Sequence, residues 1–319
     1  MRVLVTGGAG FIGSHLCGQL LARGDPAACI DNFDPFYPER LKRRALDPLV
    51  AQGLRLFPAD IRDAAAVERA LRDFRPDCIV HLAALAGVRP SLERPAEYLD
   101  VNVRGTAVLL EAARKAQVQR FVFGSSSSVY GAQAVPPFRE TARIDSPLSP
   151  YAASKAAGEQ LVSTWHNLYG LEAISLRFFT VYGARQRPDL AIHKFARRMI
   201  AGQKLPFFGD GSSRRDYTFI DDILAGVLAA LTVPLARHEI VNLGGAQTTS
   251  LRDLIGLLEE TLGLRAELDV QPAQPGDMPL TSADVTRAKE ILGYVPRTPL
   301  GKGLQLFAEW ICGEGRDWV

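Results

Sequence analysis

The sequence predicts an α/β protein in which a doubly wound, parallel sheet is covered by helices on both faces. Short apolar runs alternate with helix-like stretches through the first half of the chain. These runs are apolar on both faces, which is typical of strands buried between two helix layers. After about Gly183 proline and glycine become frequent and the predicted elements shorten, which indicates a smaller mixed α/β lobe.

The predicted elements alternate along the first half of the chain. We expect strands at 2–6, 27–30, 54–58, 78–82, 121–123 and 173–178. We expect helices at 13–23, 64–74, 98–116 and 151–169. The predicted division therefore places the sheet domain at 1–183 and the smaller lobe at 184–319, with some chain crossing back to the sheet.

Composition narrows the class of protein. The 319 residues are 47% hydrophobic and 23% charged, with a formal net charge of +2, as in an ordinary soluble globular protein. Such a balance gives no field that favours nucleic acid, and we interpret Lys42-Arg43-Arg44 as a solvated helix face. The amino terminus runs straight into a strand without a signal peptide, and no apolar stretch is long enough to span a membrane. We therefore expect a cytoplasmic protein.

The four cysteines show no metal-ligand spacing and no disulfide-like pattern. They are Cys17, Cys29, Cys78 and Cys312. We predict buried thiols in a reducing compartment, and no metal site.

A glycine fingerprint joins the first strand to the first helix. Gly7 and Gly10 allow a tight turn that brings the backbone close to a pyrophosphate, and Gly13 permits close packing of helix on strand. The amino terminus of the following helix attracts negative charge, and Phe11 and Ile12, just before it, are expected to contact the dinucleotide. This strand–turn–helix context predicts a Rossmann dinucleotide site.

An acidic residue at the end of the second strand selects the dinucleotide. Asp31 can accept both ribose hydroxyls of NAD and would repel the 2′-phosphate of NADP, and Asn32 follows it. Arg43 and Arg44 leave NADP as an alternative. After the third strand, Asp60 and Ile61 are placed to flank the adenine; alternatively, Asp60 opens the helix that starts near Ala64.

Tyr151 and Lys155 lie four residues apart and so share one face of a predicted helix. An ammonium beside a phenol favours the phenolate and lowers the pKa of tyrosine from its usual value of about 10. Downstream of a dinucleotide fingerprint, the pair predicts a proton acceptor for an alcohol that loses hydride.

Four stretches together resemble the extended short-chain dehydrogenase/reductase superfamily, in particular its nucleotide-sugar epimerases. They are TGGAGFIG (6–13), HLAALAGV (81–88), SSSSVYG (125–131) with YAASK (151–155), and RRDYTFIDD (214–222). The resemblance implies a catalytic group of Ser126, Tyr151 and Lys155. It also implies a bound NAD that is regenerated in each turnover, lined by Leu82, Ala83, Ala84, Asn102 and Phe178.

In the carboxyl-terminal lobe the same resemblance implies a UDP-sugar site. Phe208 would meet the uracil, Arg215 would hold the diphosphate and Asp277 would contact the ribose. Relatives often dimerise through helices equivalent to 98–116 and 151–169, so a homodimer is expected. Apolar positions on these helices fit that pairing but could equally face the chain's own sheet; they are Leu109, Leu110, Ala113, Leu161 and Val162.

The residues before Val-Tyr-Gly bear on which sugar is used. Dehydrating and decarboxylating relatives usually carry a glutamate there, whereas this chain has Ser127 and Ser128. The strings 177–183, 187–189 and 274–277 resemble UDP-glucuronate 4-epimerases. The three serine hydroxyls and Thr180 could donate to a sugar carboxylate, unless the serines merely tolerate a tight turn.

The resemblance therefore implies that the chain inverts C4 of UDP-glucuronate to give UDP-galacturonate through a transient 4-keto sugar. Two other activities stay open: epimerisation of UDP-glucose, and net NAD(P)-dependent reduction of a nucleotide sugar. Arg187 would grip the diphosphate or close its loop against solvent.

Overall fold

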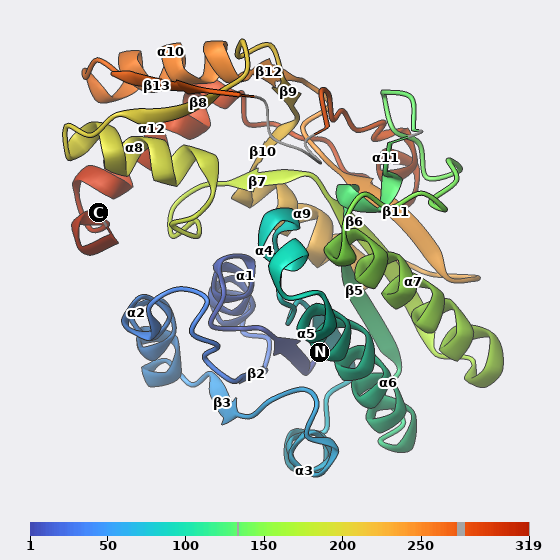
Figure 1. The fold of residues 1–319 in the computed structure, drawn as a ribbon. Helices are drawn as coiled ribbons and strands as arrows, with labels where there is room; N and C mark the ends of the chain where they lie inside the picture. Colours follow the sequence, from blue (N-terminus) through green and yellow to red (C-terminus); the bar gives the residue numbers. More distant parts are fainter. Residues whose placement is uncertain (133, 273–277, 319) are drawn as a thin grey trace. The chain divides into compact units, whose positions relative to one another are not determined.

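The structure is a computed structural model and describes residues 1–132, 134–272 and 278–318. The chain forms two compact units (Figure 1). The first contains Met1–Ala134, Glu140–Arg177 and Gly226–Val241. The second contains Val135–Arg139, Phe178–Ala225 and Asn242–Val319.

A seven-stranded sheet with the order β11-β6-β5-β4-β1-β2-β3 forms the centre of the fold (Figure 1). Its strands are β1 Val3–Thr6, β2 Ala27–Asp31, β3 Arg55–Pro58, β4 Cys78–His81, β5 Arg120–Ser126, β6 Glu172–Phe178 and β11 Glu239–Leu243. β1 pairs in parallel with both β2 and β4, so Thr6 lies beside Ile30 and His81. The predicted doubly wound α/β fold is confirmed.

Helices pack on both faces of this sheet. The helices of the first unit are α1 Phe11–Ala22, α2 Glu39–Ala51, α3 Ala64–Phe74, α4 Val88–Glu93, α5 Pro95–Leu99, α6 Gly105–Lys115 and α7 Pro150–Tyr169. α3, α6 and α7 pack side by side over one face (Figure 1), where Leu4, Ile30 and Phe121 belong to one buried cluster. The alternate residue Cys29 lies beside Cys17 of α1 instead. Each apolar side chain buried in this way stabilises the fold by about 1.5–3 kcal/mol.

The helix predicted at 98–116 is three segments in the structure. α5 ends at Leu99, a π-helical turn follows at Asp100–Arg104, and α6 begins at Gly105. In this turn the Gly105 amide bonds to the carbonyl of Asp100, five residues earlier. A π-helical turn inserts a residue without breaking the helical course, which the spacing of apolar residues cannot reveal.

Two expectations about charged and thiol side chains are each wrong for one residue, Lys42 and Cys312. Lys42 is buried, because its ammonium donates to the carbonyl of Asp34 at 2.6 Å and lies over the ring of Tyr37. Its neighbours Arg43 and Arg44 are exposed as expected, and Arg43 pairs with Glu39. Cys312 is also exposed, whereas the other three thiols are buried as predicted.

The second unit contains shorter strands and the remaining helices. The strands are β7 Thr180–Tyr182, β8 Leu205–Phe208, β9 Arg214–Arg215, β10 Tyr217–Phe219, β12 Thr249–Ser250 and β13 Leu268–Gln271. The helices are α8 Ala191–Ile200, α10 Leu251–Leu262, α11 Thr286–Leu292 and α12 Leu300–Cys312, and α9 Ile220–Ala230 runs from this unit into the first.

Two aspartates of the 214–222 stretch hold loops of the second unit. Asp216 is fully buried and accepts hydrogen bonds from the amides of Gly245, Ala246 and Ala283 at 2.6–3.1 Å. Burial raises the pKa of Asp216, and these amides act against that shift. Asp222 accepts from the amides at 297 and 298. These carboxylates therefore have structural roles.

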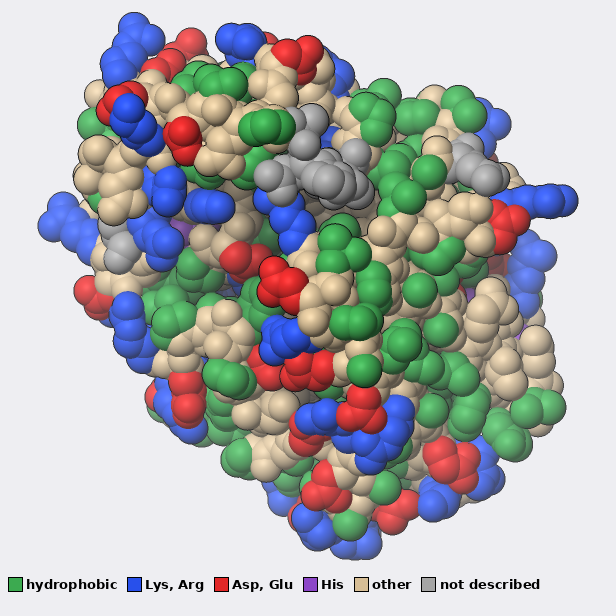
Figure 2. Space-filling view, in the orientation of Figure 1, with side chains coloured by type: hydrophobic (Ala, Val, Ile, Leu, Met, Phe, Trp, Pro, Cys, Tyr) green, Lys and Arg blue, Asp and Glu red, His purple; other side chains and the backbone are tan. Residues whose placement is uncertain are grey.

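The visible surface of the first unit carries charges of both signs. Acidic and basic side chains are interspersed there instead of forming a field of one sign (Figure 2). Within the described part of the chain, no helix is long and apolar enough to cross a membrane.

Candidate functional site

The glycine loop folds tightly against the segment that follows β4. Gly7 has φ +73°, and a β-carbon there would lie 2.7 Å from the amide nitrogen of Ala83. A β-carbon on Gly13 would collide with the Gly7 carbonyl oxygen, which already accepts from the Gly10 amide at 3.0 Å. Only glycine therefore permits this approach of loop, strand and helix.

The amino terminus of α1 suits an anion. Among the described residues, no side chain caps this helix, and its first turn carries no acidic residue. The first amides of a helix lack partners within the helix and carry a partial positive charge. Phe11 and Ile12 contribute such amides, so the loop fits the pyrophosphate of a dinucleotide.

Asp31 ends β2 beside this loop. Its buried carboxylate accepts from the amide of Ala9 at 2.9 Å and from the amide of Phe33 at 2.8 Å. Burial raises the pKa of Asp31, while the two amides act in the opposite direction. Each oxygen keeps a further lone pair for a ribose hydroxyl, and a 2′-phosphate would meet a fixed negative charge.

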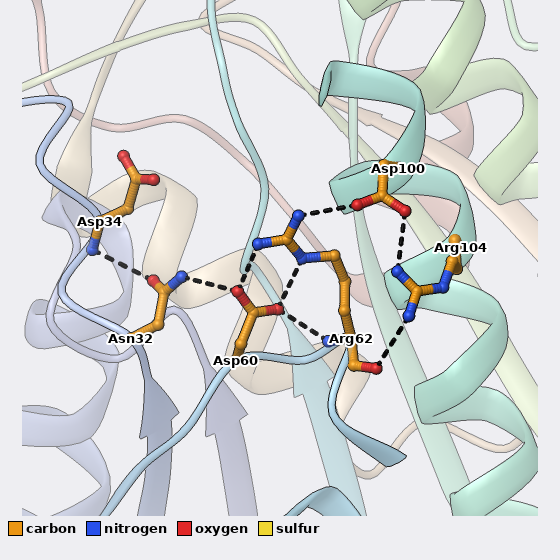
Figure 3. Close-up of polar contacts among 6 residues, drawn as sticks. All are labelled: Asn32, Asp34, Asp60, Arg62, Asp100 and Arg104. Carbon is orange, nitrogen blue, oxygen red and sulfur yellow. Dashed lines mark hydrogen bonds and ion pairs between the residues drawn. The ribbon is translucent and has the colours of Figure 1, made fainter. Parts of the chain in front are cut away.

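An ion-pair network extends from Asn32 to the π-helical turn (Figure 3). Asn32 donates to Asp60 at 3.1 Å, and Arg62 bridges Asp60 and Asp100, with both ion pairs at 2.7 Å. Hydrogen bonding from Arg62 lowers the pKa of Asp60 to about 2. Arg104 pairs with Asp100 from the other side at 2.9 Å.

The alternative role of Asp60 as the start of the next helix is wrong. The cap of α3 is Asp63, whose side chain accepts from the amide of Ala66 at 3.0 Å. The neighbouring Ile61 is buried, and its side chain lies against Gly105.

Helix α7, which carries Tyr151 and Lys155, is hydrogen-bonded to the strand that carries Ser125 and Ser126. Lys155 donates to the carbonyl of Gly124 at 2.7 Å and lies 5.0 Å from the centre of the Phe123 ring. Burial lowers the pKa of Lys155 to about 8, although the charge of Glu159 acts against the shift. Ser149 caps the helix and Pro150 opens it, and this Ser-Pro pair is a helix-start signal present in the sequence.

Tyr151 lies on the first turn of α7. The ring of Tyr98 meets the Tyr151 ring edge-on, with centroids 6.3 Å apart and planes at 86°. The hydroxyl of Tyr98 donates to the carbonyl of Ala86 at 3.2 Å, so the supporting ring is itself held in place.

Ser126 ends β5 and shapes the turn beyond it. Its hydroxyl donates to the hydroxyl of Ser128 at 3.1 Å and accepts from the Ser128 amide at 3.2 Å. The structure thus brings two of the three predicted serine hydroxyls together, and Ser127 is half-buried between them. The serines therefore form a tight turn and also place a group of hydroxyls there, so the two interpretations of the serine run are compatible.

A buried ion pair, which no local pattern in the sequence predicts, lies one turn further along α7. Glu159 accepts two hydrogen bonds from Arg177, at 2.9 and 2.8 Å, and one from Ser125 at 2.6 Å. The Arg177 guanidinium also stacks 4.7 Å from the ring centre of Tyr130. Because these residues are far apart in sequence, no local spacing could indicate the pair.

The other predicted cofactor residues of the first unit follow β4 or lie on the π-helical turn. Leu82, Ala83 and Ala84 are half-buried. Asn102 is buried, and its amide group donates to the Leu85 carbonyl and to the Ser154 hydroxyl, both at 2.9 Å.

The remaining predicted residues belong to the second unit. Phe178 ends β6, and Thr180 opens β7, where its amide donates to the Asp216 carbonyl at 3.0 Å. Arg187 forms a two-point ion pair with Asp189. Phe208 is half-buried, Arg215 bonds to the Arg214 carbonyl at 2.9 Å, and Asp277 lies outside the described residues.

Comparison with known proteins supplies the family. Residues 3–244 match the model of the NAD dependent epimerase/dehydratase family. A UDP-glucuronate 4-epimerase of Thermodesulfobacterium geofontis is 39% identical over 96% of this chain and 95% of its own.

Two crystal structures are similar over nearly the whole chain. A Bacillus cereus UDP-glucuronic acid 4-epimerase, in complex with UDP-glucuronic acid and NAD, has a TM-score of 0.91 and 37% identity over 98% of this chain and 99% of its own. A Thermotoga maritima UDP-glucose 4-epimerase with UDP-glucose has a TM-score of 0.91 and 34% identity, with the same coverage. This chain belongs to the NAD-dependent epimerase/dehydratase family.

Proposed function

We propose that this protein is an NAD-dependent UDP-sugar 4-epimerase that interconverts UDP-glucuronate and UDP-galacturonate. The observation that carries the proposal is the catalytic helix, in which Lys155 is bound to the strand that ends at Ser126. Full-length similarity to UDP-glucuronate 4-epimerases supports the choice of sugar.

The residues of the first unit account for the chemistry. Tyr151, as a phenolate, takes the proton of the sugar 4-hydroxyl, and the buried ammonium of Lys155 favours that phenolate. Ser126 donates to the 4-oxygen as it becomes a carbonyl and so stabilises the developing charge. NAD supplies the acceptor and later the donor of the hydride. The 4-keto sugar rotates within the site, and hydride then returns to its other face, so no net oxidation occurs.

The serine-rich turn favours a sugar acid. Positions 127 and 128 carry hydroxyls where a dehydratase or decarboxylase would need an acid, and hydroxyls can donate to a carboxylate. We propose that Ser127, Ser128 and Thr180 hold the C5–carboxyl bond of the β-keto acid out of line with the carbonyl, which suppresses loss of CO2. Residues 184–319 would mainly bind the nucleotide sugar, with Arg187, Phe208, Arg215 and Asp277 as the proposed contacts.

The deciding experiment uses the purified protein without added NAD. Incubation with UDP-glucuronate should yield UDP-galacturonate by NMR, with almost no change in absorbance at 340 nm because hydride returns to the sugar. If conversion is absent both with and without added NAD, the proposal is wrong. Continuous accumulation of NAD(P)H would instead identify a net dehydrogenase.

The choice between sugars has its own test. The similarity to a UDP-glucose 4-epimerase structure makes UDP-glucose the second candidate, so both sugars should be compared at equal concentration. Thr180→Ala should weaken UDP-glucuronate binding or increase decarboxylation and leave UDP-glucose turnover unchanged. Unchanged binding and no extra CO2 would remove the carboxylate role.

We also propose that the protein is a cytoplasmic homodimer. The helix positions singled out in the sequence do not support the dimer, because Leu109, Leu110, Ala113 and Val162 are fully buried in the unit's own core and Leu161 packs against it. The support comes instead from the exposed Leu168 and Tyr169 at the end of α7. Light scattering should give twice the chain mass, and Leu168→Asp should reduce it. The cytoplasmic location rests on the buried thiols.

A further inference from the structure

A buried histidine connects the glycine loop with the π-helical turn. His81 is the last residue of β4 and is 1% exposed. Its Nδ1 lies 2.7 Å from the hydroxyl of Thr6, and its Nε2 lies 2.9 Å from the hydroxyl of Thr106. Thr6 immediately precedes the glycine loop, and Thr106 lies on the first turn of α6. The imidazole therefore spans two elements of the proposed cofactor site.

The neighbours of these hydroxyls determine the position of every proton. The Thr106 hydroxyl donates to the Asn102 carbonyl at 2.5 Å, so it must accept from Nε2 of His81. Burial, with a smaller effect of Lys155, lowers the pKa of His81 to about 3, so the ring is neutral. Nδ1 is then an acceptor, and it receives the proton of the Thr6 hydroxyl. That hydroxyl in turn accepts from the Ala83 amide at 3.2 Å.

The chain of hydrogen bonds continues from Asn102 to the catalytic tyrosine. The Asn102 side chain accepts from the Leu85 amide at 2.8 Å and donates to the Ser154 hydroxyl at 2.9 Å. Ser154 donates to the backbone carbonyl of Tyr151 at 2.8 Å. The same residue, Asn102, thus contacts both the segment after β4 and the first turn of α7.

We propose that His81, held as the neutral Nε2–H tautomer, is a positioning residue that sets the glycine loop and the catalytic Tyr151 relative to one another. It acts through Thr6 on one side and through Thr106 and Asn102 on the other. The hydrogen bonds run in one direction, so the opposite tautomer would leave two acceptors, Nε2 and the Thr106 hydroxyl oxygen, facing each other without a proton between them. This role of His81 rests on the proposed function, because His81 would position the cofactor-binding loop and the catalytic tyrosine together.

The first test replaces His81→Leu, with His238→Leu as the matched control. His238 is another imidazole of the first unit, with its Nε2 2.9 Å from the hydroxyl of Ser175 and its pKa lowered by burial. We expect His81→Leu to lower kcat at least about tenfold, with little change in KM, because small misplacements of reacting groups are costly. It should also release NAD that the wild type retains through gel filtration. Equal behaviour of the two variants would overturn the inference.

A second pair of variants guards against simple misfolding. Thr106→Val removes the hydroxyl at nearly constant shape, whereas Thr106→Ser retains it. Thr106→Ser should keep wild-type kcat and NAD content. Thr106→Val should have a lower kcat and less bound NAD, as expected for His81→Leu. If valine and serine behave alike, the chain of hydrogen bonds has no functional role.

The tautomer can be observed directly. Nitrogen NMR of the labelled full-length protein should show His81 with protonated Nε2 and unprotonated Nδ1, unchanged from about pH 8 to about pH 5. The opposite tautomer, or titration in this range, would contradict the assignment. This measurement needs no substrate, so it stays informative if the proposed epimerase activity fails; a wild type that converts no UDP-sugar would count against that activity alone.

Discussion

The buried ammonium of Lys155 donates a hydrogen bond to the carbonyl oxygen of Gly124 at 2.7 Å. This bond joins helix α7 to strand β5, which ends two residues later at Ser126. Lys155 therefore holds its positive charge in place through the backbone, not through an ion pair. Burial lowers the pKa of Lys155 to about 8, so the ammonium should lose its proton as the pH rises through this value.

The pH dependence of stability should reveal this buried charge. The folded-state pKa of Lys155 is about 8, below the ordinary value of 10.5. Between these values the unfolded chain binds more protons than the folded chain, so the unfolding free energy rises with pH. Relative to Lys155→Met, the wild type should gain about 3 kcal/mol across this window, at about 1.4 kcal/mol per pKa unit. Denaturant unfolding at several pH values measures the difference.

The same lysine should limit activity at alkaline pH. The ammonium is lost as pH rises through about 8, so kcat/KM of the free enzyme should fall there. Lys155→Arg, whose guanidinium stays charged, should move this alkaline limb upward in whatever activity remains. A wild-type profile that stays flat to about pH 10 would show that the pKa of Lys155 is not depressed.

Two glycines of α1 should respond oppositely to alanine. At Gly13 the new β-carbon would meet the backbone of Gly7, so Gly13→Ala should lose bound NAD and lower the unfolding free energy. At Gly18 it would meet only Leu49 at 3.6 Å, and alanine is the better helix residue by about 1 kcal/mol. Gly18→Ala should therefore stabilise the protein and keep NAD. Equal losses in both variants would contradict the close approach at Gly13.

Asp31 should control both the affinity and the choice of dinucleotide. Asp31→Asn removes the charge and one acceptor, so NAD should bind at least about tenfold more weakly. The ratio of NAD affinity to NADP affinity should also fall. The control Asp34→Asn changes a carboxylate that, within the described part of the chain, accepts from a local amide alone, that of Phe36 at 2.9 Å, and should remain close to wild type. Calorimetric titration of protein freed of dinucleotide measures both. An unchanged preference in Asp31→Asn would exclude the predicted repulsion.

The ion-pair network of Figure 3 should support cofactor binding through Arg62. Arg62→Gln removes both the Asp60 and the Asp100 pairs, so the pKa of Asp60 should rise from about 2 toward its ordinary value. NAD affinity should fall about threefold to tenfold, as expected for charged bonds that are partly exposed. Arg104→Gln leaves the Asp60 pair intact and is the control. If the two variants bind NAD with equal affinity, Asp60 has no role in cofactor binding.

Local signals in the chain specified much of the fold. The helix expected at 64–74 occurs at Ala64–Phe74, because its apolar residues repeat with helical spacing, Asp63 caps its start and Arg75 ends it in a left-handed conformation. The buried strands are recognisable in the sequence because both of their faces are apolar. Their ends are less clear: β5 extends from Arg120 to Ser126, beyond the expected 121–123, because polar serines do not indicate a strand.

Lys42 and the helix expected at 98–116 show where local signals failed. Lys42 looked like a surface residue, yet the Asp34 carbonyl and the Tyr37 ring bury it. In the region 98–116, the π-helical turn adds one residue to the helical turn while the apolar pattern continues. The residue composition therefore does not indicate it. In both cases the deciding contacts are made by groups whose positions the residue pattern does not encode.

The glycine loop, Asp31 and the Tyr151–Lys155 spacing follow from the chain alone, because each works through its own backbone conformation or through one helical turn. The Glu159–Arg177 pair and the link from Thr6 through His81 to Thr106 arise only on folding. Residues 18 to 75 positions apart meet there, and the proton on His81 depends on a carbonyl that the folded backbone presents. Buried polar groups must find partners wherever the fold offers them, and that requirement is set in three dimensions.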